Sequence, residues 1–480
     1  MRSIHWTIAA AALGLSTVVT TLTGSGCGGR AARDDDAGAA TDGADASEGQ
    51  PDGGTGRFTA SDLSVASDGR IVVVGTIKGS VDLDGTSIVS AGGDDVVLAT
   101  FSSSGQLVWA RRFGDADEQR GGHVAVDAAG NIVVILTFAG QLDMGGGAFV
   151  SAGSADVCVA KLDAAGKHLW SHKFGGIGLE SESGIAVDAS GRVAAAANSS
   201  IPFDFATPGS PPAVAFSGYH SSVVALDPAG NLVWSKAWGG ARVAAVSIGR
   251  SDAVLVAGGA FEPVDFGGGA LASKGINDAY VVDLTPAGGH VWSRRFGGSR
   301  SDGAAAFDVA ADTSGNVLLT GTFNGNLDIS DPPLVGPTAP DHASTPTEIF
   351  VAKLDPGGGT LWGRHLGGAS GNYSGLGVGI VATASGNVAL TGSFAGSVDF
   401  GLGALDPEMK DYPSAFLLET DPAGVSSWNR RIPYGVTRVR SEASGRLLAA
   451  GSFALTAADL AASLRTLSTG SNAFLIEYAP

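Results

Sequence analysis

An aspartate recurs along this sequence in matching contexts such as SVDL, QLDM and PVDF. Calcium prefers such oxygen ligands, but equivalent residues of adjacent repeats in a radial fold lie too far apart to share one ion. Each aspartate also follows a strand-like run, where it can cap a turn by accepting hydrogen bonds from backbone N–H groups. We therefore expect caps, keep calcium binding as the alternative and assign no metal site. The series comprises Asp82, Asp143, Asp204, Asp265, Asp328, Asp399 and Asp459.

The histidines form no recognisable catalytic or metal-binding set. His168 and His172 lie four residues apart, which on a strand separates them by about 13 Å. The sequence holds no HExxH motif, no P-loop and no GxSxG motif with convincing partners. We predict no catalytic residue, no bound cofactor and no enzyme activity. We expect structural roles for the lone histidines His123, His168, His172, His220, His290, His342 and His365.

The chain has two cysteines, too few for a zinc site built from cysteine pairs. Cys158 lies in the run DVCVAKLD, at a position that related runs fill with an aromatic residue, as Phe350 does in EIFVAKLD. We therefore expect Cys158 to be a small buried hydrophobic side chain, and neither a ligand nor a nucleophile.

The other cysteine, Cys27, directly follows a segment with the pattern of an export signal. Residues 1–26 combine Arg2 with a long stretch of apolar or small residues. A small-residue run that ends in cysteine resembles the lipobox of bacterial lipoproteins, although Gly24 stands where that motif usually has leucine. The resemblance implies lipidation of Cys27. Ordinary signal cleavage and an uncleaved anchor are the alternatives, although a membrane span needs roughly 20 apolar residues.

Residues 27–57 are acidic, rich in Gly, Ala and Asp, and carry no large apolar side chain after the cysteine. Such a segment cannot bury enough surface to offset its ordering entropy, so we predict a disordered tether. The whole chain has a formal net charge of −18. Because nucleic-acid binding needs clustered Lys and Arg, this charge argues against a nucleic-acid partner.

From residue 58 onward the sequence repeats itself. A tryptophan recurs in contexts such as QLVWARRFG and HVWSRRFGG, and six of the eight tryptophans occupy this position. Together with the aspartate series, these tryptophans define seven repeats, of which the last is truncated. Repeats of this length indicate a solenoid, a propeller or a similar array. The recurring tryptophans are Trp109, Trp170, Trp234, Trp292, Trp362 and Trp428.

Each repeat contains four strand-like runs. In the second repeat they are HVAVD, NIVVILTF, DVCVAKLD and HLWSHKF, and the turns DAAG and DAAGK join them in pairs. Asp or Ser followed by Gly or Asn forms tight turns, so the runs pair as two antiparallel hairpins. A four-stranded unit cannot bury both faces alone, whereas units stacked radially bury each other's faces. We predict an all-β fold over residues 58–480, a seven-bladed β-propeller built from four-stranded antiparallel blades.

The residue types place the strands within each blade. The first run, as in GIAVD, is small and apolar, which suits a crowded centre, and His123 and Asp308 are isolated exceptions. The fourth run is rich in cations, which on an outer edge strand discourage further strand pairing. We expect edge protection and solvation, with a basic girdle for acidic polymers as the alternative, for Arg111, Arg112, Lys173, Lys236, Arg294, Arg295, Arg364, Arg430 and Arg431.

The closure of the ring is left open by the sequence. The seventh repeat stops after its third run, at Pro480. In many propellers the other end of the chain supplies the missing strand, and Gly56-Arg57-Phe58 weakly echoes the RRFG of the fourth runs. The last blade is therefore either incomplete, with three strands, or closed by the N-terminal segment.

The units NVALTGSFAGSVDFGLGAL, EIFVAKLD and GGHVWSRRFGG resemble the bacterial β-propeller repeat often called the SBBP repeat, over residues 58–480. The resemblance implies a propeller in a secreted or surface protein and assigns no catalytic residue. The run VVALDPAGNLVW is also similar to the LDxxTGxxxW unit of quinoprotein dehydrogenases and of the propeller lipoprotein that assists outer-membrane protein assembly. In those families the tryptophans dock neighbouring blades. The threonine of that unit is missing throughout this chain.

Together these features favour an exported, monomeric lipoprotein that is attached to the outer membrane or cell surface through its lipid anchor alone. A periplasmic or secreted protein is the alternative. We expect a non-enzymatic scaffold that binds a protein or glycan partner, with the connection 330–348 (SDPPLVGPTAPDHASTPTE) as its most unusual loop. The alternatives are a scaffold for outer-membrane protein assembly, and a quinoprotein-like or polysaccharide-acting propeller enzyme. An enzyme would need acids and bases that converge on the centre.

Overall fold

The computed structural model describes residues 56–200, 220–299, 302–336, 347–367, 374–407, 413–432, 435–442, 445–452, 464–466 and 473–478, all within one compact unit, Gly56–Pro480. The predicted export signal, Cys27 and the tether up to residue 55 lie outside the described residues. The described part consists of strands and turns, with one short 3-10 helix, η1 (Arg250–Asp252). No helix in this part combines the length and the apolar character that a membrane crossing requires.

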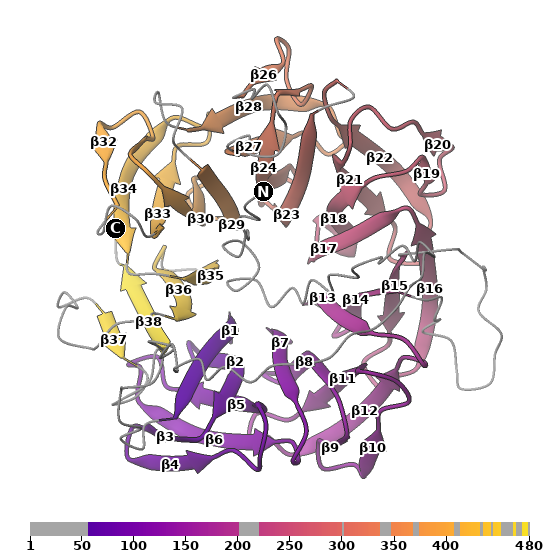
Figure 1. Cartoon of the computed structure of the whole chain (residues 1–480), viewed down its shortest axis with the longest axis vertical. Helices are drawn as coiled ribbons and strands as arrows, with labels where there is room; N and C mark the ends of the chain where they lie inside the picture. Colours follow the sequence, from indigo (N-terminus) through magenta and orange to yellow (C-terminus); the bar gives the residue numbers. More distant parts are fainter. Residues whose placement is uncertain are drawn as a thin grey trace, which may run out of the picture. The chain divides into compact units, whose positions relative to one another are not determined.

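Six four-stranded antiparallel sheets have the strand order predicted for propeller blades, and they surround a common centre (Figure 1). In each sheet the chain begins at the innermost strand and moves outward. Blades 1 to 3, from inner to outer strand, are β1 (Arg57–Val65), β2 (Ile71–Lys78), β5 (Asp95–Phe101) and β6 (Leu107–Phe113); β7 (Gln119–Val126), β8 (Ile132–Phe138), β11 (Asp156–Leu162) and β12 (His168–Phe174); and β13 (Glu180–Val187), β14 (Val193–Ser199), β15 (His220–Leu226) and β16 (Leu232–Gly239).

Blades 4 to 6 repeat this order. They are β17 (Ala241–Ile248), β18 (Val254–Ala260), β21 (Asp278–Leu284) and β22 (His290–Phe296); β23 (Gly303–Ala311), β24 (Val317–Asn324), β27 (Glu348–Leu354) and β28 (Thr360–Leu366); and β29 (Ser374–Ala382), β30 (Val388–Ala395), β33 (Ser414–Thr420) and β34 (Ser426–Ile432).

Small two-stranded hairpins lie in the connections between second and third strands, which the sequence predicted only as long glycine-rich links. Figure 1 shows them at the outer perimeter of the ring. Within the described residues they are β3 (Ser80–Leu83) with β4 (Thr86–Val89), β9 (Gln141–Asp143) with β10 (Ala148–Val150), β19 (Val264–Asp265) with β20 (Ala270–Leu271), β25 (Asn326–Leu327) with β26 (Leu334–Val335), and β31 (Val398–Asp399) with β32 (Ala404–Leu405).

A last sheet completes the ring and is built differently. It consists of β35 (Val436–Ser441), β36 (Leu447–Ser452), β37 (Leu464–Thr466) and β38 (Ala473–Tyr478). Its spatial order is β35-β36-β38-β37, so a three-residue strand from the connection before β38 takes the outermost place. The predicted all-β propeller of four-stranded antiparallel blades is confirmed, with a minor difference in count. Six blades are regular, and the seventh sheet does not repeat their order.

The N-terminal segment does not complete this seventh sheet. In the described part of the chain β1 pairs with β2 alone, and Phe58 lies opposite Ile77. That pairing buries Phe58 completely in the core of blade 1, which fixes the register. Of the two alternatives that the sequence left open, closure by Gly56-Arg57-Phe58 is therefore not the one observed. Instead, Leu448 and Ala450 of β36 share a core cluster with blade 1, so the ring closes by packing of one sheet face on another.

The hydrophobic cores lie between neighbouring blades. One cluster joins Val72 and Val74 of β2 to Val134 and Leu136 of β8, and it includes Cys158. Cys158 is free and fully buried, as predicted, and burial raises the pKa of its thiol. Each blade thus depends on its neighbours to cover its faces.

Each tryptophan of the repeating series except the last docks its blade onto the next one. Trp109 Nε1 donates to the carbonyl of Ala164 at 3.1 Å, in the turn between the third and fourth strands of blade 2. The ring also lies against Gly166 of that turn. Trp428 differs, because it donates to Glu419 of its own blade at 2.7 Å. The other equivalent bonds join Trp170 to Pro228 (3.1 Å), Trp234 to Pro286 (3.0 Å), Trp292 to Pro356 (2.9 Å) and Trp362 to Pro422 (3.0 Å).

The variant Gly358→Ala is expected to lower the free energy of unfolding by about 2–4 kcal/mol. Gly358 has φ +80°, which strains an alanine, and a methyl group there would lie 2.7 Å from Trp292 Cε3. Gly386→Ala is the matched control, because Gly386 has φ +84° but only Pro422 nearby, at 3.8 Å. Urea titrations followed by tryptophan fluorescence measure both losses. Equal losses would contradict the docking role of Trp292.

Candidate functional site

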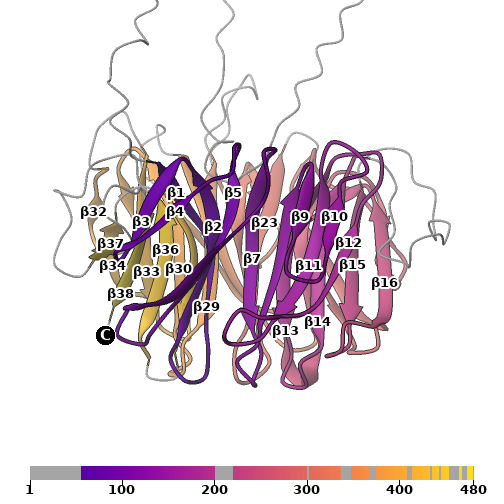
Figure 2. The same cartoon turned by 90° about the horizontal axis from the view of Figure 1, so that it is seen from below.

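The ring has two rims, and the strands run between them (Figure 2). At one rim the first strand of each blade turns into the second and the third into the fourth. These turns share one build, in which the first residue donates its backbone N–H to the last carbonyl, as from Asp127 to Asn131 at 2.9 Å. Asp127 Oδ1 also accepts from Ala129 N and Asn131 N. The predicted tight turns are confirmed, and this rim is uniform.

The opposite rim, called here the loop rim, carries the links from second to third strands and from one blade to the next. The first kind of link is similar in length in blades 1, 2, 4 and 6, with residues 79–94, 139–155, 261–277 and 396–413, but it is longer in blade 5, with residues 325–347. The connection 330–348 belongs to this rim, and its residues 337–346 lie outside the described part. Variable connections on a regular scaffold are the usual location of binding sites.

A pocket of about 500 Å³ opens on the loop rim between blades 4 and 5. Three connections meet there: the link before β21, the link from β22 to β23, and the link that contains the β25–β26 hairpin. The pocket therefore combines polar side chains with an apolar wall of two prolines and a valine. It is lined by Lys274, Gly297, Gly298, Ser299, Asn326, Asp328, Pro332, Pro333 and Val335.

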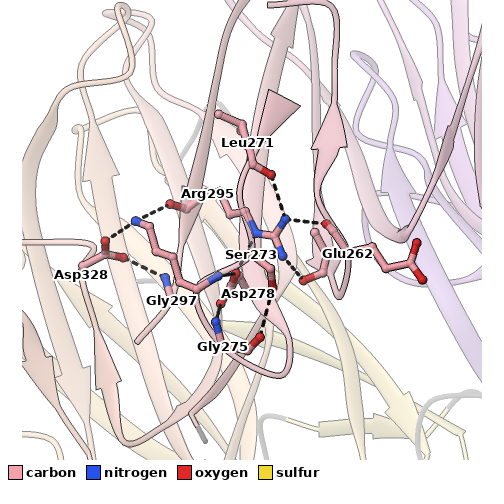
Figure 3. A network of polar contacts seen from close by, with 10 residues as sticks. Glu262, Leu271, Ser273, Gly275, Asp278, Arg295, Gly297 and Asp328 are labelled. Atoms are coloured by element: carbon pink, nitrogen blue, oxygen red, sulfur yellow. Dashed lines mark hydrogen bonds and ion pairs between the residues drawn. The ribbon is translucent and has the colours of Figure 1, made fainter. Parts of the chain in front are cut away.

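An ion pair between Lys274 and Asp328 bridges the two blades at this pocket (Figure 3). Lys274 Nζ also donates to the carbonyl of Arg295 at 3.2 Å, and Asp328 Oδ1 accepts from Gly297 N at 2.8 Å. Both side chains are partly exposed, so the site presents one charge of each sign to solvent.

Below this pair, Arg295 holds the connections of blade 4 together. Its guanidinium, only 2% exposed, pairs with the fully buried Asp278 at 2.7 Å. It also donates to the carbonyls of Ala260 at 2.8 Å, Glu262 at 2.6 Å and Leu271 at 3.2 Å. Figure 3 shows these bonds converging on one side chain. The wall of the pocket is thereby fixed by a buried charge network.

Pairs of this kind recur where the third strand begins. A buried acid there meets a base from the fourth strand: Asp95 with Arg112 (2.9 Å), Asp156 with Lys173 (3.0 Å) and Glu348 with His365 (2.8 Å). The expectation of solvation is therefore wrong for the buried Arg295, whereas Arg112 and Lys173 stay partly exposed on outer strands and pair with a buried acid as well. These cations neutralise carboxylates that the fold buries.

The neighbouring cations of the fourth strands point to the next blade instead. Arg111 donates to the carbonyl of Gly166 at 2.5 Å and Arg294 to that of Gly358 at 2.9 Å. Side chains alternate along a strand, so consecutive cations serve the blade's own acid and the neighbouring blade in turn. Arg364 makes a similar bond to the next blade, to the carbonyl of Ala423 at 3.3 Å.

The centre of the ring holds a polar cluster from three blades. Every inner strand has a bulge, and Asp62 and His123 follow it at equivalent positions of β1 and β7. Asp62 Oδ2 lies 3.3 Å from His123 Nδ1, and Asp62 Oδ1 lies 3.0 Å from Arg440 of β35. Asp62 also accepts from Leu63 N at 2.8 Å and Val124 N at 3.3 Å. It therefore links the seventh sheet to blades 1 and 2.

Asp308 repeats this arrangement in blade 5. It accepts from Val309 N at 3.0 Å and from Ile380 N of the next blade at 2.9 Å. Arg438 lies 3.9 Å from it and donates to the carbonyl of Val378 at 2.9 Å. The prediction that His123 and Asp308 are isolated is wrong. Sequence reasoning missed Asp62, Arg438 and Arg440, although the constant offset of Asp62 and Arg438 from the turn that follows could have aligned those two with His123 and Asp308.

Burial and neighbouring charges shift the pKa values of Asp62 and His123 in this cluster. Burial alone would raise the pKa of Asp62, but Arg440 and the His123 hydrogen bond outweigh it and lower that pKa to about 2. Burial lowers the pKa of His123. Asp62 thus acts as a charged acceptor for backbone N–H groups on inner strands that have no further strand to pair with, and Asp308 accepts from equivalent N–H groups.

The recurring aspartates cap turns, as expected, in four of the copies that the structure describes. The carboxylates of Asp82, Asp143, Asp265 and Asp399 each accept from backbone N–H groups of the following hairpin turn, for example Asp265 from Gly267 N at 2.7 Å. Asp328 is the exception described above. Asp204 and Asp459 lie outside the described residues. No group of three or more His, Cys, Asp or Glu side chains suited to a metal ion occurs in the described part.

The remaining histidines that the structure describes lie apart from one another and contact the fold. His168 Nε2 lies 3.0 Å from Ser171 Oγ, and His290 Nε2 lies 3.1 Å from Ser293 Oγ. His172 packs near Trp170, with ring centroids 5.5 Å apart. His220 is buried at the start of β15, and His342 lies outside the described residues.

Together the fold and this rim define the chain as a β-propeller with one uniform rim and one rim of variable loops. No known protein-family model matches the sequence, and no curated protein matches it. The predicted SBBP-repeat membership therefore stays a prediction.

Solved structures with a similar fold include BamB from Moraxella catarrhalis, with 10% identity and a TM-score of 0.37, covering 87% of this chain and 85% of that one. Another is an ulvan lyase of a polysaccharide lyase family, with 10% identity and a TM-score of 0.47, covering 88% and 94%. A third is virginiamycin B lyase from Staphylococcus aureus, with 7% identity and a TM-score of 0.35, covering 82% and 91%. At these identities the likeness concerns the fold.

Proposed function

We propose that this chain is a non-enzymatic propeller scaffold that binds a protein or glycan partner through its loop rim. The observation that carries the proposal is the difference between the rims. One rim repeats a similar turn, with one departure at η1, whereas the other bears the long link of blade 5 and the pocket beside Lys274 and Asp328. Selection for folding alone explains the first rim, and a binding role explains the variety of the second.

The acids and bases of the centre support a binding scaffold over an enzyme. Asp62 and Asp308 are each committed to two backbone N–H groups and a neighbouring arginine. The net charge of −18 makes a polyanionic glycan the least suitable partner. A protein or a neutral glycan fits the pocket's balanced pair of charges and its proline wall.

The proposal includes export and lipidation at Cys27, with the acidic segment as a tether to the envelope. Its support is the sequence of residues 1–57. Mass spectrometry of the mature N-terminus should find a diacylglycerol-modified Cys27. An unmodified N-terminus downstream of residue 27 would remove the anchor from the proposal and leave the rim as the binding site.

An exchange of connections tests the rim. Residues 325–347 are replaced by the blade 4 link 261–277, which removes Pro332, Pro333 and Val335 but keeps β24 and β27. The matched control replaces turn 312–316 on the uniform rim by turn 127–131. Envelope extract, with and without prior protease treatment, is passed over each immobilised full chain. We expect the loop-rim exchange to lose partners that the control retains, and identical partner sets for all three chains would contradict the proposal.

A further inference from the structure

Two buried carboxyl groups from neighbouring blades face each other at the joint between blades 2 and 3. Asp156 begins β11 and Glu180 begins β13, and both residues are 0% exposed. Asp156 Oδ1 and Glu180 Oε2 converge on Gly175, where an added methyl group would lie 2.5 Å and 2.9 Å from them. Only glycine lets the two oxygens approach in this way.

Of these two facing oxygens, Asp156 Oδ1 lacks a hydrogen-bond donor. Asp156 Oδ2 accepts from Ala152 N at 2.9 Å and pairs with Lys173 Nζ at 3.0 Å, but its Oδ1 has no hydrogen-bond partner. Glu180 Oε1 accepts from Ser199 Oγ at 2.9 Å, and Oε2 accepts from Gly176 N at 3.3 Å. A buried acceptor without a donor is costly, and a proton on one carboxyl group supplies that donor.

We propose that Asp156 and Glu180 share one proton, which makes the joint between blades 2 and 3 sensitive to pH. With this proton the site holds one carboxylate, one carboxylic acid and the ammonium of Lys173, which sum to zero charge. Loss of the proton leaves an unpaired negative charge in a desolvated place. A divalent cation in place of the proton would leave an excess positive charge beside Lys173.

The surroundings agree with this assignment. Burial, and then the nearby Asp156, raise the pKa of Glu180 to about 7, although bonds from Ser199 and Gly176 act in the opposite direction. Lys173 approaches from β12, and the buried His220 of β15 lies opposite Ser199 across the sheet. Ser199 is the last residue of β14, so the site also touches the base of the link to β15 on the loop rim.

The joint between blades 1 and 2 contains a version of the same site in which an amide replaces one carboxyl group. Asp95, Gly114 and Gln119 stand where Asp156, Gly175 and Glu180 stand one repeat later, and Asp95 and Gln119 converge on Gly114 in the same way. The amide of Gln119 cannot ionise in the physiological range. The chain therefore offers its own control, in which one joint should respond to pH and the other should not.

The sign follows from the raised pKa of Glu180. A carboxyl group that holds its proton more tightly when folded contributes stability at low pH, and that stability is lost as pH rises through about 7. We therefore expect the joint between blades 2 and 3 to weaken from about pH 4.5, the ordinary pKa of a glutamate, to about pH 7, while the joint between blades 1 and 2 does not.

Carboxyl ¹³C resonances of the full chain, followed from pH 4 to pH 9, test the shared proton. Asp156→Asn should lower the titration midpoint of Glu180 by about one unit or more, because the partner that holds the proton is gone. Glu182→Gln is the control. Burial also raises the pKa of Glu182 to about 7, but no carboxylate contributes to that shift. An unchanged Glu180 midpoint in Asp156→Asn would overturn the proposal.

A second test introduces a new carboxyl pair at the joint between blades 1 and 2, and it does not require that the fold tolerate Asp156→Asn. Gln119→Glu should create a second pair with Asp95 and steepen the loss of stability from about pH 4.5 to pH 7, whereas Glu180→Gln should flatten it. Thermal unfolding at each pH, with calcium or with a chelator, measures both effects. Stability that depends on calcium instead of pH would overturn the shared proton in favour of a bound cation.

Discussion

Replacing Arg295 by methionine is expected to lower the free energy of unfolding by about 3–5 kcal/mol, because it leaves a buried carboxylate without its cation. Asp278 is 0% exposed, and Arg295 is its ion-pair partner at 2.7 Å. The same change removes the donor for the carbonyls of Ala260, Glu262 and Leu271. Methionine keeps much of the side-chain volume, so the loss reports the charge and the hydrogen bonds.

The matched control is Arg112→Met in blade 1, where Asp95 is as buried as Asp278 but the arginine side chain is 32% exposed and can be replaced in part by solvent. We expect a loss of about 1–2 kcal/mol there. Urea unfolding of each full chain measures the two values. Adding Asp278→Asn to Arg295→Met should recover part of the stability, since it removes the stranded charge. Equal losses for the two single variants would show that burial does not set the strength of this pair.

Arg295 also shows how far the sequence could predict the site. The position of the cation on the fourth strand followed from the repeat, but its partner did not. Asp278 is the first residue of β21, directly after a glycine-rich link, where an acid is typical of an exposed turn. Burial of that position depends on the packing of blades 4 and 5, which a local pattern does not encode. The pocket between those blades could not be predicted from the sequence for the same reason.

The fold itself followed from two markers that recur in register. The tryptophans define contacts between blades and the aspartates define hairpin turns, so both patterns reflect the local geometry of one unit. The hairpins β3–β4 and β9–β10 were missed because their strands are short and lie within glycine-rich runs. The closure stayed open in the sequence because it depends on the packing of sheet faces from opposite ends of the chain.

Ring closure rests on contacts between residues almost four hundred positions apart in the chain, since Arg440 bonds to Asp62 with a sequence separation of 378. In the described part of the chain, no strand from the N-terminal end pairs with the sheet at the C-terminal end, and none pairs in the opposite sense. Arg446 adds a bond to the carbonyl of Ser103 at 3.2 Å, and Leu448 and Ala450 pack on blade 1. Asp62 is the centre of this interface, because it accepts from blades 1, 2 and the seventh sheet.

Asp62→Ala is therefore expected to lower the free energy of unfolding by about 2–4 kcal/mol, because it leaves Leu63 N and Val124 N without an acceptor and Arg440 without its partner. Asp308→Ala is the matched control, since Asp308 holds two equivalent N–H groups between blades 5 and 6. Blades 5 and 6 are joined directly along the chain, so their interface reforms at little entropic cost. The first and last sheets lack such a short link, and their reunion must close a loop the length of the ring.

Hydrogen exchange distinguishes the two cases. In Asp62→Ala the amides of β1, β35 and β36 should exchange faster than those of the other blades, because the ring opens at that interface before it unfolds. In Asp308→Ala the change should stay near β23 and β29. The difference in the free energy of unfolding between wild type and Asp62→Asn should also shrink as pH falls from about 4 to 2. The pKa of Asp62 is lowered to about 2 in the folded chain, so its stabilising charge is lost over this range. Exchange that rises equally in all blades would mean that the ring has no preferred opening point, and that Arg440 and Asp62 are one contact among many.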